Sequence, residues 1–394
     1  MVLQLRRTFP LSAQLIGVDG GASEVKVHEV LVVDDELGRR LKLGERAASR
    51  VYPRVPSFAP PSARGIQRKT ELGAIDAAER EQGWAWIEAT AQCIARVARD
   101  RGAKSVLIGI AMPGQKSLDG RSVEFAFNGP RIPGFLDRLE EQLHDDGVEL
   151  LAPLIPLLSD GLCCGLGEDY AEGGLLRDVD DAYYIGGGTG LAEALKVRGK
   201  LVETEDFQGA FPKAWALSDR NGTNFEFGLS AAGINRRYAE RALLKLPLEA
   251  GQFPEQRVEV DVVAQSVFEE TASFLAQLLV RRLCTLGDLP KAVLDAAQPF
   301  TLDRFVVGQR LGRLLDDART RPWFLVPFRG ELLSEMRAAE LTHGRYRELE
   351  RELSRSSRPR KSDANDFVRV SHLRAAPAIG AAATALIAWG NASA

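Results

Sequence analysis

The stretch that decides the fold runs from residue 16 to residue 27 and reads IGVDGGASEVKV. The apolar run Leu15 to Val18, which leads into this stretch, predicts a short buried strand. Asp19-Gly20-Gly21 predicts a tight turn directly after it. The β-branched run VKVHEVLVV (25–33) predicts a second, antiparallel strand. Glycines let a backbone approach a phosphate closely, the Ser23 hydroxyl adds a donor, and Asp19 can hold hydrated Mg²⁺. An acidic hairpin turn without a ligand is the alternative interpretation.

The same order of elements recurs in the second half of the chain. The segment DAYYI (181–185) predicts a strand ending in the turn Gly186 to Gly190, and LAEALKV (191–197) predicts its hairpin partner. Three glycines and Thr189 give this turn the same capacity for phosphate. Neither turn matches the P-loop pattern, so a Walker-type site is not expected. A later strand at 304–307 ends at Gly308, and the shared order predicts two copies of one structural unit.

Composition narrows the function classes. The chain has 394 residues, of which 45% are hydrophobic and 27% charged, as in soluble globular proteins of two or three domains. A net charge of -3 argues against a nucleic-acid partner. The four cysteines show neither a disulfide framework nor the paired spacing of a zinc site. No signal peptide or membrane span is evident, so we expect a cytoplasmic protein without a membrane partner.

Between the two glycine turns lies a second acidic position. The apolar run Leu154 to Leu158 leads into Ser159-Asp160, just before a helix expected at 162–168. Asp160 can be a helix N-cap, or a general base that accepts a proton as a hydroxyl attacks phosphorus. Its place between the two phosphate turns favours the general base.

Taken together, these motifs resemble the ROK family (repressors, open reading frames and kinases), within the actin, heat-shock chaperone and hexokinase superfamily. The stretch 16–27 is similar to the family's first phosphate motif. The residues that the resemblance assigns there to phosphate and Mg²⁺ are Asp19, Gly20, Gly21, Ser23 and Lys26. IGIAMPGQKSLDGRSVEFAFN (108–128) resembles the segment that ends in a sugar-binding asparagine, here Asn128. LLSDGLCCGLGE (157–168) resembles the segment that carries the catalytic aspartate, here Asp160, which also lies at the substrate.

The resemblance continues in the second half. GGGTGLAEALKVRGKLV (186–202) is similar to the second phosphate motif, which implies that Gly188, Thr189 and Gly190 bind the nucleotide. FVVGQRLG (305–312) resembles the adenosine-binding glycine turn at Gly308, although Gln309 and Arg310 replace two glycines. HLRAAPAIGAAATAL (372–386) matches the closing helix, and Glu226 falls on a family glutamate, which implies that it binds substrate.

The chain departs from the family around the substrate. The histidine and cysteine-rich zinc element is absent, and NGTNFEFGLSAAGI (221–234) stands in its place. The segment that supplies a sugar-contacting glutamate reads GAFPKAW (209–215) here. We therefore expect no zinc and an altered pocket, so that a hexose, an amino sugar or a cyclitol all remain open as the substrate.

The resemblance implies an α/β fold of two ribonuclease H-like domains facing across a nucleotide and substrate cleft, as in actin-like ATPases. The first domain is expected at 1–158, completed by a C-terminal helix at 377–394, and the second at 159–376. The second includes the charged segment 342–366, expected as a solvated helix and loop, with a basic patch as the alternative. A homodimer is left open.

The expected activity is that of an ATP- and Mg²⁺-dependent carbohydrate kinase, a phosphotransferase with an alcohol group as acceptor. A catalytically degenerate sugar- or nucleotide-binding protein of the same fold is the alternative. A sugar-sensing repressor is not favoured, because only 18 residues precede Asp19.

Overall fold

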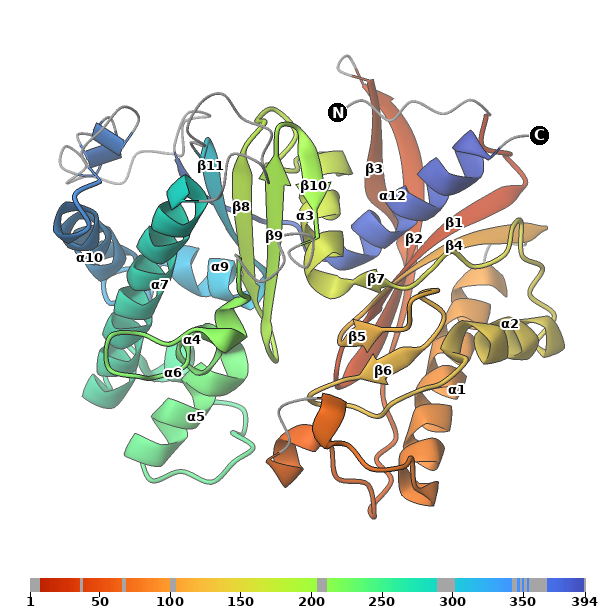
Figure 1. Cartoon of the computed structure of the whole chain (residues 1–394), viewed down its shortest axis with the longest axis horizontal. Helices are drawn as coiled ribbons and strands as arrows, with labels where there is room; N and C mark the ends of the chain where they lie inside the picture. Colours follow the sequence, from red (N-terminus) through yellow and green to blue (C-terminus); the bar gives the residue numbers. More distant parts are fainter. Residues whose placement is uncertain are drawn as a thin grey trace. The chain divides into compact units, whose positions relative to one another are not determined.

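The computed structural model describes residues 8–35, 38–65, 69–99, 104–203, 211–288, 302–341, 346–347, 349–350, 353 and 367–392. The chain divides into two compact units, residues 1–177 with 375–394 and residues 178–374. The sequence placed the boundary at residue 158. Residues 159–177 instead belong to the first unit, because α3 (Asp160–Tyr170) packs on the last helix, α12 (Ala376–Asn391) (Figure 1).

The first unit is built on a five-stranded sheet with the order β3-β2-β1-β4-β7. Its strands are β1 Ala13–Gly20, β2 Glu24–Asp35, β3 Gly38–Val51, β4 Ser105–Met112 and β7 Leu158–Ser159. β1 is antiparallel to β2 and parallel to β4, which in turn is parallel to β7. The predicted hairpin is confirmed. The predictions did not include β3, whose sequence GRRLKLGERAASRV lacks an apolar run.

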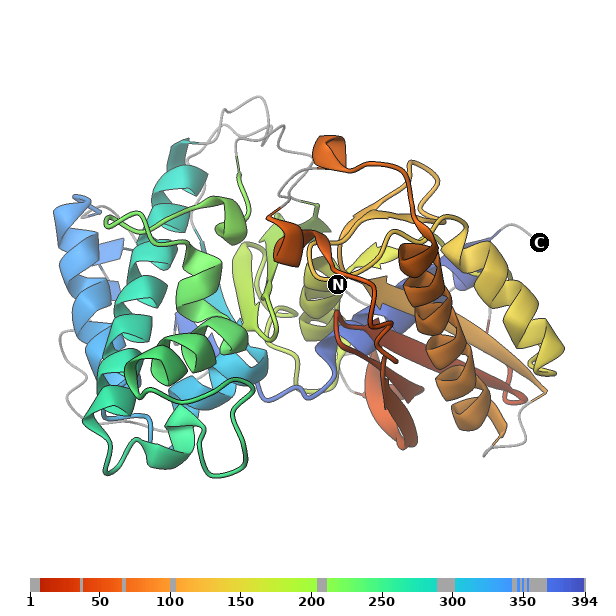
Figure 2. The ribbon, with the colours of Figure 1, turned by 90° about the horizontal axis from the view of Figure 1, so that it is seen from below.

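The two faces of this sheet carry different helices, because side chains alternate along a strand. Ile16 and Val18 of β1 belong to a buried cluster with α1 (Ala77–Arg99) and α2 (Phe135–Asp145). These two helices lie side by side in Figure 2. α12 covers the opposite face of β1 and β4, and α3 packs against it. A small hairpin of β5 (Gln115–Lys116) and β6 (Val123–Phe125) completes the unit.

α12 approaches the sheet unusually closely. A Cβ added to Gly17 of β1 would lie 2.0 Å from the Ala378 carbonyl oxygen, and one added to Gly109 of β4 would lie 1.9 Å from that of Ala381. On the other side, a Cβ on Gly380 of α12 would lie 2.0 Å from the Cys163 carbonyl oxygen of α3. These glycines therefore let backbone pack directly against backbone.

The second unit repeats the topology of the first. Its sheet has the order β10-β9-β8-β11-β12, with an antiparallel β8–β9–β10 run followed by parallel β11 and β12. The strands are β8 Ala182–Gly187, β9 Leu191–Val197, β10 Lys200–Val202, β11 Arg304–Gly308 and β12 Val368–Val370. The predicted structural duplication is confirmed.

Helices bury one face of the second sheet. They are α4 Phe225–Leu229, α5 Ala231–Arg241, α6 Pro254–Arg257, α7 Val262–Asp288, α9 Gln309–Asp316 and α10 Leu325–Ala338. α7 and α10 lie side by side (Figure 1). α5 ends at Arg241, and Leu243, two residues later, adopts a left-handed φ of 56°.

Two predictions from the sequence concern the charged segment 342–366 and membrane-spanning helices. Most of the charged segment 342–366 lies outside the described residues. Within the described part of the chain, no helix is long and apolar enough to cross a membrane.

The contact between α12 and the sheet yields the first prediction. Gly17→Ala and Gly109→Ala place a methyl group against backbone that cannot move alone, so each should lower the free energy of unfolding by roughly 1–3 kcal/mol or more. Gly73→Ala is the matched control, because a Cβ at Gly73 meets nothing within 4 Å. It should change stability by less than about 0.5 kcal/mol. Urea denaturation measures all three, and equal stabilities would contradict the close contact.

Candidate functional site

The strand register of the first unit brings two predicted acidic residues to one edge of the sheet. Asp19 on β1 pairs with Ala111 on β4, and Ala111 pairs with Leu158 on β7. Asp160 follows β7 directly and opens α3. Alternation along β1 puts the Asp19 side chain on the same face as Gly17, the face that carries α12 and α3. The two carboxyl groups are therefore close enough to act on each other electrostatically.

The surroundings of Asp19 disfavour the charged form of its carboxyl group. Although part of its surface is exposed, the burial of its carboxyl raises its pKa from 3.8 to about 6. The negative charges of Asp160 and Glu24 contribute to this rise in pKa, and the positive charge of Lys26, its cross-strand neighbour, opposes it. Lys26 also forms an ion pair with Glu24 at 2.6 Å. This edge of the first unit thus concentrates negative charge that a cation would relieve.

The structure decides which residue caps α3. The Ser159 hydroxyl accepts a hydrogen bond from the Leu162 N–H at 3.3 Å, so Ser159 is the N-cap. Asp160 occupies the first helical position, where its carboxylate accepts a hydrogen bond from the adjacent Gly161 N–H at 3.0 Å. The interpretation of Asp160 as the helix cap is therefore wrong, because the preceding residue already fills that role.

The first glycine turn is shaped by its neighbours. A Cβ on Gly20 would lie 2.8 Å from the Met112 methyl carbon and 3.0 Å from the Ala111 carbonyl oxygen. At Gly21 the Glu24 carbonyl oxygen would lie at 3.1 Å. Ser23 is exposed, and its carbonyl accepts the Tyr52 N–H at 3.0 Å. Close packing therefore explains Gly20, and the turn presents an exposed hydroxyl beside Asp19.

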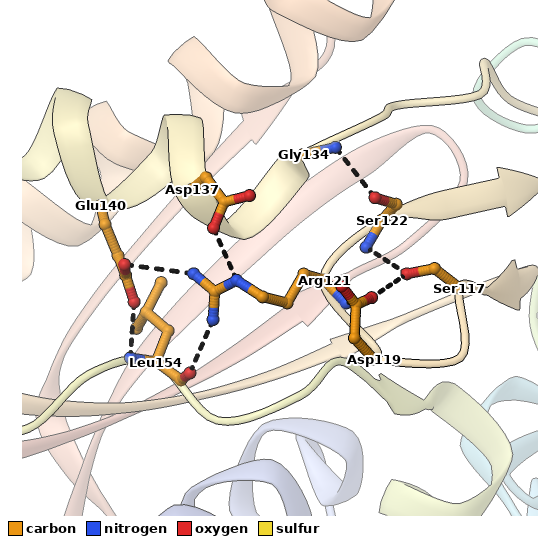
Figure 3. Close-up of polar contacts among 8 residues, drawn as sticks. All are labelled: Ser117, Asp119, Arg121, Ser122, Gly134, Asp137, Glu140 and Leu154. Atoms are coloured by element: carbon orange, nitrogen blue, oxygen red, sulfur yellow. Dashed lines mark hydrogen bonds and ion pairs between the residues drawn. The ribbon is translucent and has the colours of Figure 1, made fainter.

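Arg121 ties the β5–β6 hairpin to the chain that leads into β7. Its Nε donates to Asp137 Oδ1 at 2.6 Å, and its two terminal nitrogens donate to Glu140 Oε2 at 3.2 Å and to the Leu154 carbonyl at 3.4 Å. Glu140 also accepts the Leu154 N–H at 2.8 Å. Figure 3 shows the guanidinium between α2 and residue 154. The sequence analysis did not identify this residue.

The same hairpin carries the predicted substrate-binding asparagine. Asn128 is exposed in a turn just after β6, and the adjacent Phe127 carbonyl accepts the Ser62 N–H at 2.9 Å. At the other end of the hairpin, the Leu157 N–H donates to the Gly120 carbonyl at 2.9 Å. The hairpin and the start of β7 are thus held as one assembly, so the segments bearing Asn128 and Asp160 are fixed to each other.

The second glycine turn rests on the junction of α4 and α5. The Gly188 N–H donates to the Gly190 carbonyl at 2.9 Å, and the Gly188 carbonyl accepts the Ala231 N–H at 2.8 Å. A Cβ on Gly187 would lie 2.9 Å from the Leu229 carbonyl oxygen. Thr189 at the tip is exposed. Within the second unit, this turn is therefore a supported loop that presents a hydroxyl.

Glu226 lies at this turn. Its Oε2 accepts the Leu191 N–H at 3.3 Å and would lie 3.1 Å from a Cβ on Gly190. The sequence analysis gave Glu226 to the substrate and Gly190 to the nucleotide. The structure brings them together, so a group bound by Glu226 would lie next to a group bound by the turn.

A buried ion pair supports the segment that begins at Phe211. Arg282 of α7 and Glu193 of β9 have side-chain exposures of 0% and 4% and meet at 2.5 Å. Arg282 also donates to the Pro212 carbonyl at 2.7 Å, and Glu193 accepts the Ala214 N–H at 2.5 Å. The segment from 211 is thus anchored from both sides, whereas residues 209 and 210 lie outside the described part.

The described residues contain no group of three or more His, Cys, Asp or Glu side chains arranged to hold a metal ion. A cation at Asp19 would therefore take most of its ligands from water or from a bound anion.

The sequence and the structure were compared with those of known proteins. No protein-family model matches the sequence, and a search of curated proteins finds no significant match. Solved structures do match. A ROK family glucokinase from Streptomyces griseus, in complex with glucose and AMPPNP, is 19% identical with a TM-score of 0.56, over 94% of this chain and 98% of that one.

Two further structures cover nearly the whole chain. The ROK hexokinase from Thermus thermophilus is 15% identical with a TM-score of 0.53, over 96% of this chain and 100% of that one. A ROK family transcriptional regulator, a homologue of the E. coli MLC protein, is 12% identical with a TM-score of 0.55, over 97% and 80%. The chain has the fold of the ROK proteins. This ROK fold is the actin-like ATPase fold, as the resemblance implied, and it is shared by kinases and regulators alike.

The cap assignment yields the second prediction. Ser159→Ala removes the N-cap of α3 and should lower the free energy of unfolding by about 1 kcal/mol. Asp160→Asn keeps the shape and removes one of the charges that act on Asp19, so stability should be unchanged or slightly higher. Thermal melts of both variants test this. A larger loss for Asp160→Asn than for Ser159→Ala would restore a structural role for Asp160.

Proposed function

We propose that this protein is an ATP-dependent kinase that transfers the γ-phosphoryl group to a hydroxyl of a sugar or sugar-like molecule. The observation that carries the proposal is the pair Asp19 and Asp160, which the strand register brings together at the glycine turn. Since Ser159 caps α3, the helix does not need Asp160 as a cap. A carboxylate at this position is suited to accept a proton from a substrate hydroxyl.

The residues present fit a nucleotide with Mg²⁺. The raised pKa of Asp19 reports a site where added positive charge would be favourable. Mg²⁺ usually keeps several waters and binds through one or two carboxylates together with substrate phosphates. This coordination preference of Mg²⁺ is compatible with the described residues, which contain no cluster of three His, Cys, Asp or Glu side chains arranged to hold a metal ion. Asp19 would therefore hold the ion through water.

The roles of the remaining residues follow from their places. In the first unit, Gly20, Gly21, Ser23 and Lys26 would contact phosphate. In the second unit, Gly188, Thr189 and Gly190 would contact phosphate and Gly308 the adenosine. When bound, ATP supplies the phosphoryl group, and the protein contributes positioning and charge stabilisation. Asp160 would accept the proton from the attacking hydroxyl.

Substrate hydroxyls would be bound by Asn128 in the first unit and Glu226 in the second. The contact between Glu226 and the Gly190 turn supports this role, because the acceptor hydroxyl has to lie next to the transferred phosphoryl group. The segment from Phe211, held by Arg282 and Glu193, differs from the family's sugar-contacting element. We therefore keep hexoses, amino sugars and cyclitols as candidate substrates, and a thermal-shift screen with and without Mg-nucleotide would separate them.

A second candidate is a binding or regulatory protein of the same fold that has lost catalysis. The presence of a ROK regulator among the similar structures and the replacement of two glycines by Gln309 and Arg310 favour it. The two candidates differ in ATP turnover with the true substrate.

The third prediction concerns Asp160. Asp160→Asn preserves size and most hydrogen bonds but cannot accept the proton, so kcat should fall by roughly 10²–10⁴-fold while nucleotide affinity is retained. Coupled ADP-release kinetics on the best substrate of the screen measure the effect. A melting curve controls for folding, and wild-type turnover by a folded variant would remove Asp160 from the mechanism.

The fourth prediction concerns Asp19. Asp19→Ala should leave the melting temperature unchanged or raise it, because an unfavourably buried charge is removed. It should also abolish most of the difference between nucleotide affinities measured with Mg²⁺ and with EDTA. Isothermal titration calorimetry with ADP gives both values. If Mg²⁺ strengthens binding equally in both proteins, the ion is held elsewhere.

A further inference from the structure

The residue after Gly308 has a backbone conformation that its side chain disfavours. Gln309 adopts a φ of 54°, in the left-handed region where glycine is the usual residue. Such a conformation is unfavourable for a residue that carries a Cβ, and it persists only where the surroundings enforce it. The resemblance places a glycine here, and that glycine would carry no such cost.

The surroundings do enforce it. The backbone of Gln309 bridges in parallel to Gly187 of the second glycine turn. The next residue, Arg310, donates to Glu255 Oε1 at 2.7 Å and to Asn235 Oδ1 at 3.2 Å, and its guanidinium lies 5.5 Å from the Phe253 ring centroid. Arg310 therefore anchors the turn, and Gln309 is held in place from both sides.

The Gln309 side chain lies across the glycine turn. A Cβ built on Gly186 would lie 2.9 Å from Gln309 Cδ, and one built on Gly188 would lie 3.4 Å from Gln309 Oε1. The backbone that these glycines expose is thus lined by a carboxamide. A ligand that approaches Gly186 to Gly188 meets the amide of Gln309.

The duplication gives this position a counterpart in the first unit. Asp19 pairs with Ala111 one residue before the end of β1, and Gly186 pairs with Gly308 one residue before the end of β8. Position 186 therefore corresponds to position 19. Where the first unit places the Asp19 carboxylate, Gly186 has no side chain of its own, and the Tyr184 hydroxyl and the Gln309 carboxamide lie in the adjacent space, 2.7 Å and 2.9 Å from where a Cβ would stand. The second unit thus carries a neutral hydrogen-bonding group where the first carries an acid.

We propose that Gln309 is a nucleotide-binding residue whose carboxamide, held over the Gly186–Gly188 backbone, donates a hydrogen bond to a phosphate oxygen of the nucleotide. This inference rests on the proposed function. A neutral amide suits the position, because it can donate to phosphate without the repulsion that a carboxylate would add. The backbone strain at Gln309 is then the cost of bringing a polar side chain to Gly186, Gly187 and Gly188, which have none of their own.

The test compares two substitutions at this position by calorimetry with Mg-ADP. Gln309→Gly removes the amide and relieves the backbone strain, so affinity should fall about three- to tenfold, the equivalent of one hydrogen bond, while the melting temperature is unchanged or higher. Gln309→Glu keeps the size and adds a negative charge, so affinity for Mg-ADP should fall by more than with glycine. Adenosine, which has no phosphate, should lose much less than ADP in both variants.

Leu243→Gly is the matched control. Leu243 also has a left-handed φ, 56°, in the same unit and is 91% exposed, so glycine relieves the same strain there without touching the turn. Its affinity for Mg-ADP should equal that of the wild type.

The outcomes separate the two proposals. If the wild type binds no nucleotide, the proposed function fails and this inference fails with it. If the wild type binds and Gln309→Gly binds equally well or more tightly, Gln309 only fills or blocks the turn, and this inference alone is overturned. An equal loss for adenosine and ADP would overturn the assignment to phosphate.

Discussion

The first unit depends on the direct contact of the backbone of α12 with β1, β4 and α3. Gly17, Gly109 and Gly380 make this contact possible, and alanines fill most of the rest of the helix surface. A contact of this kind tolerates almost no displacement, since the atoms that would collide belong to the main chain. Asp19 follows Gly17 by two residues on the same face, and Asp160 opens the helix that packs on α12. The last helix of the chain therefore fixes the spacing of the two carboxyl groups on which the proposed chemistry depends.

Much of the fold could be predicted from local pattern. The two hairpins with their glycine turns and the repeated element order are visible in the sequence, because alternation and turn chemistry act over a few residues. Long-range contacts have no such signal. The strand β3, which is last in the sheet order and has many charged residues, was not predicted. Residues 159–177 were assigned to the second unit, because nothing local in LLSDGLCCGLGE indicates that it packs against a helix more than 200 residues later.

The site shows the same division. Motif order identified Asp19 and Asp160, and strand register brings them together, but the assignment of their roles stays a prediction. The supporting contacts were not predicted. Arg121 and the Glu193–Arg282 pair connect residues that are far apart in sequence, and a lone charge in a sequence does not reveal its partner. One signal was available for Glu193, which lies in a strand with buried neighbours and so required a partner inside the protein. In the sequence, Gln309 was visible only as a replacement of a glycine in the motif. The structure shows that it keeps the left-handed backbone conformation that glycine favours.

The two copies of the structural unit have diverged electrostatically. At the first turn, burial of the carboxyl and the negative charges of Asp160 and Glu24 raise the pKa of Asp19, so the charged form of Asp19 is unfavourable there without a cation. At the second turn, the corresponding backbone position is Gly186, and a neutral amide lies beside it. In the proposed kinase, an acid at each turn would repel a phosphate at each turn, and without an acid at either turn no carboxylate there would hold the metal ion. The two turns of the duplicated fold therefore differ in charge, with the Asp19 carboxylate on β1 at one and the Gln309 carboxamide from the start of α9 at the other, and this asymmetry is what the proposed function requires.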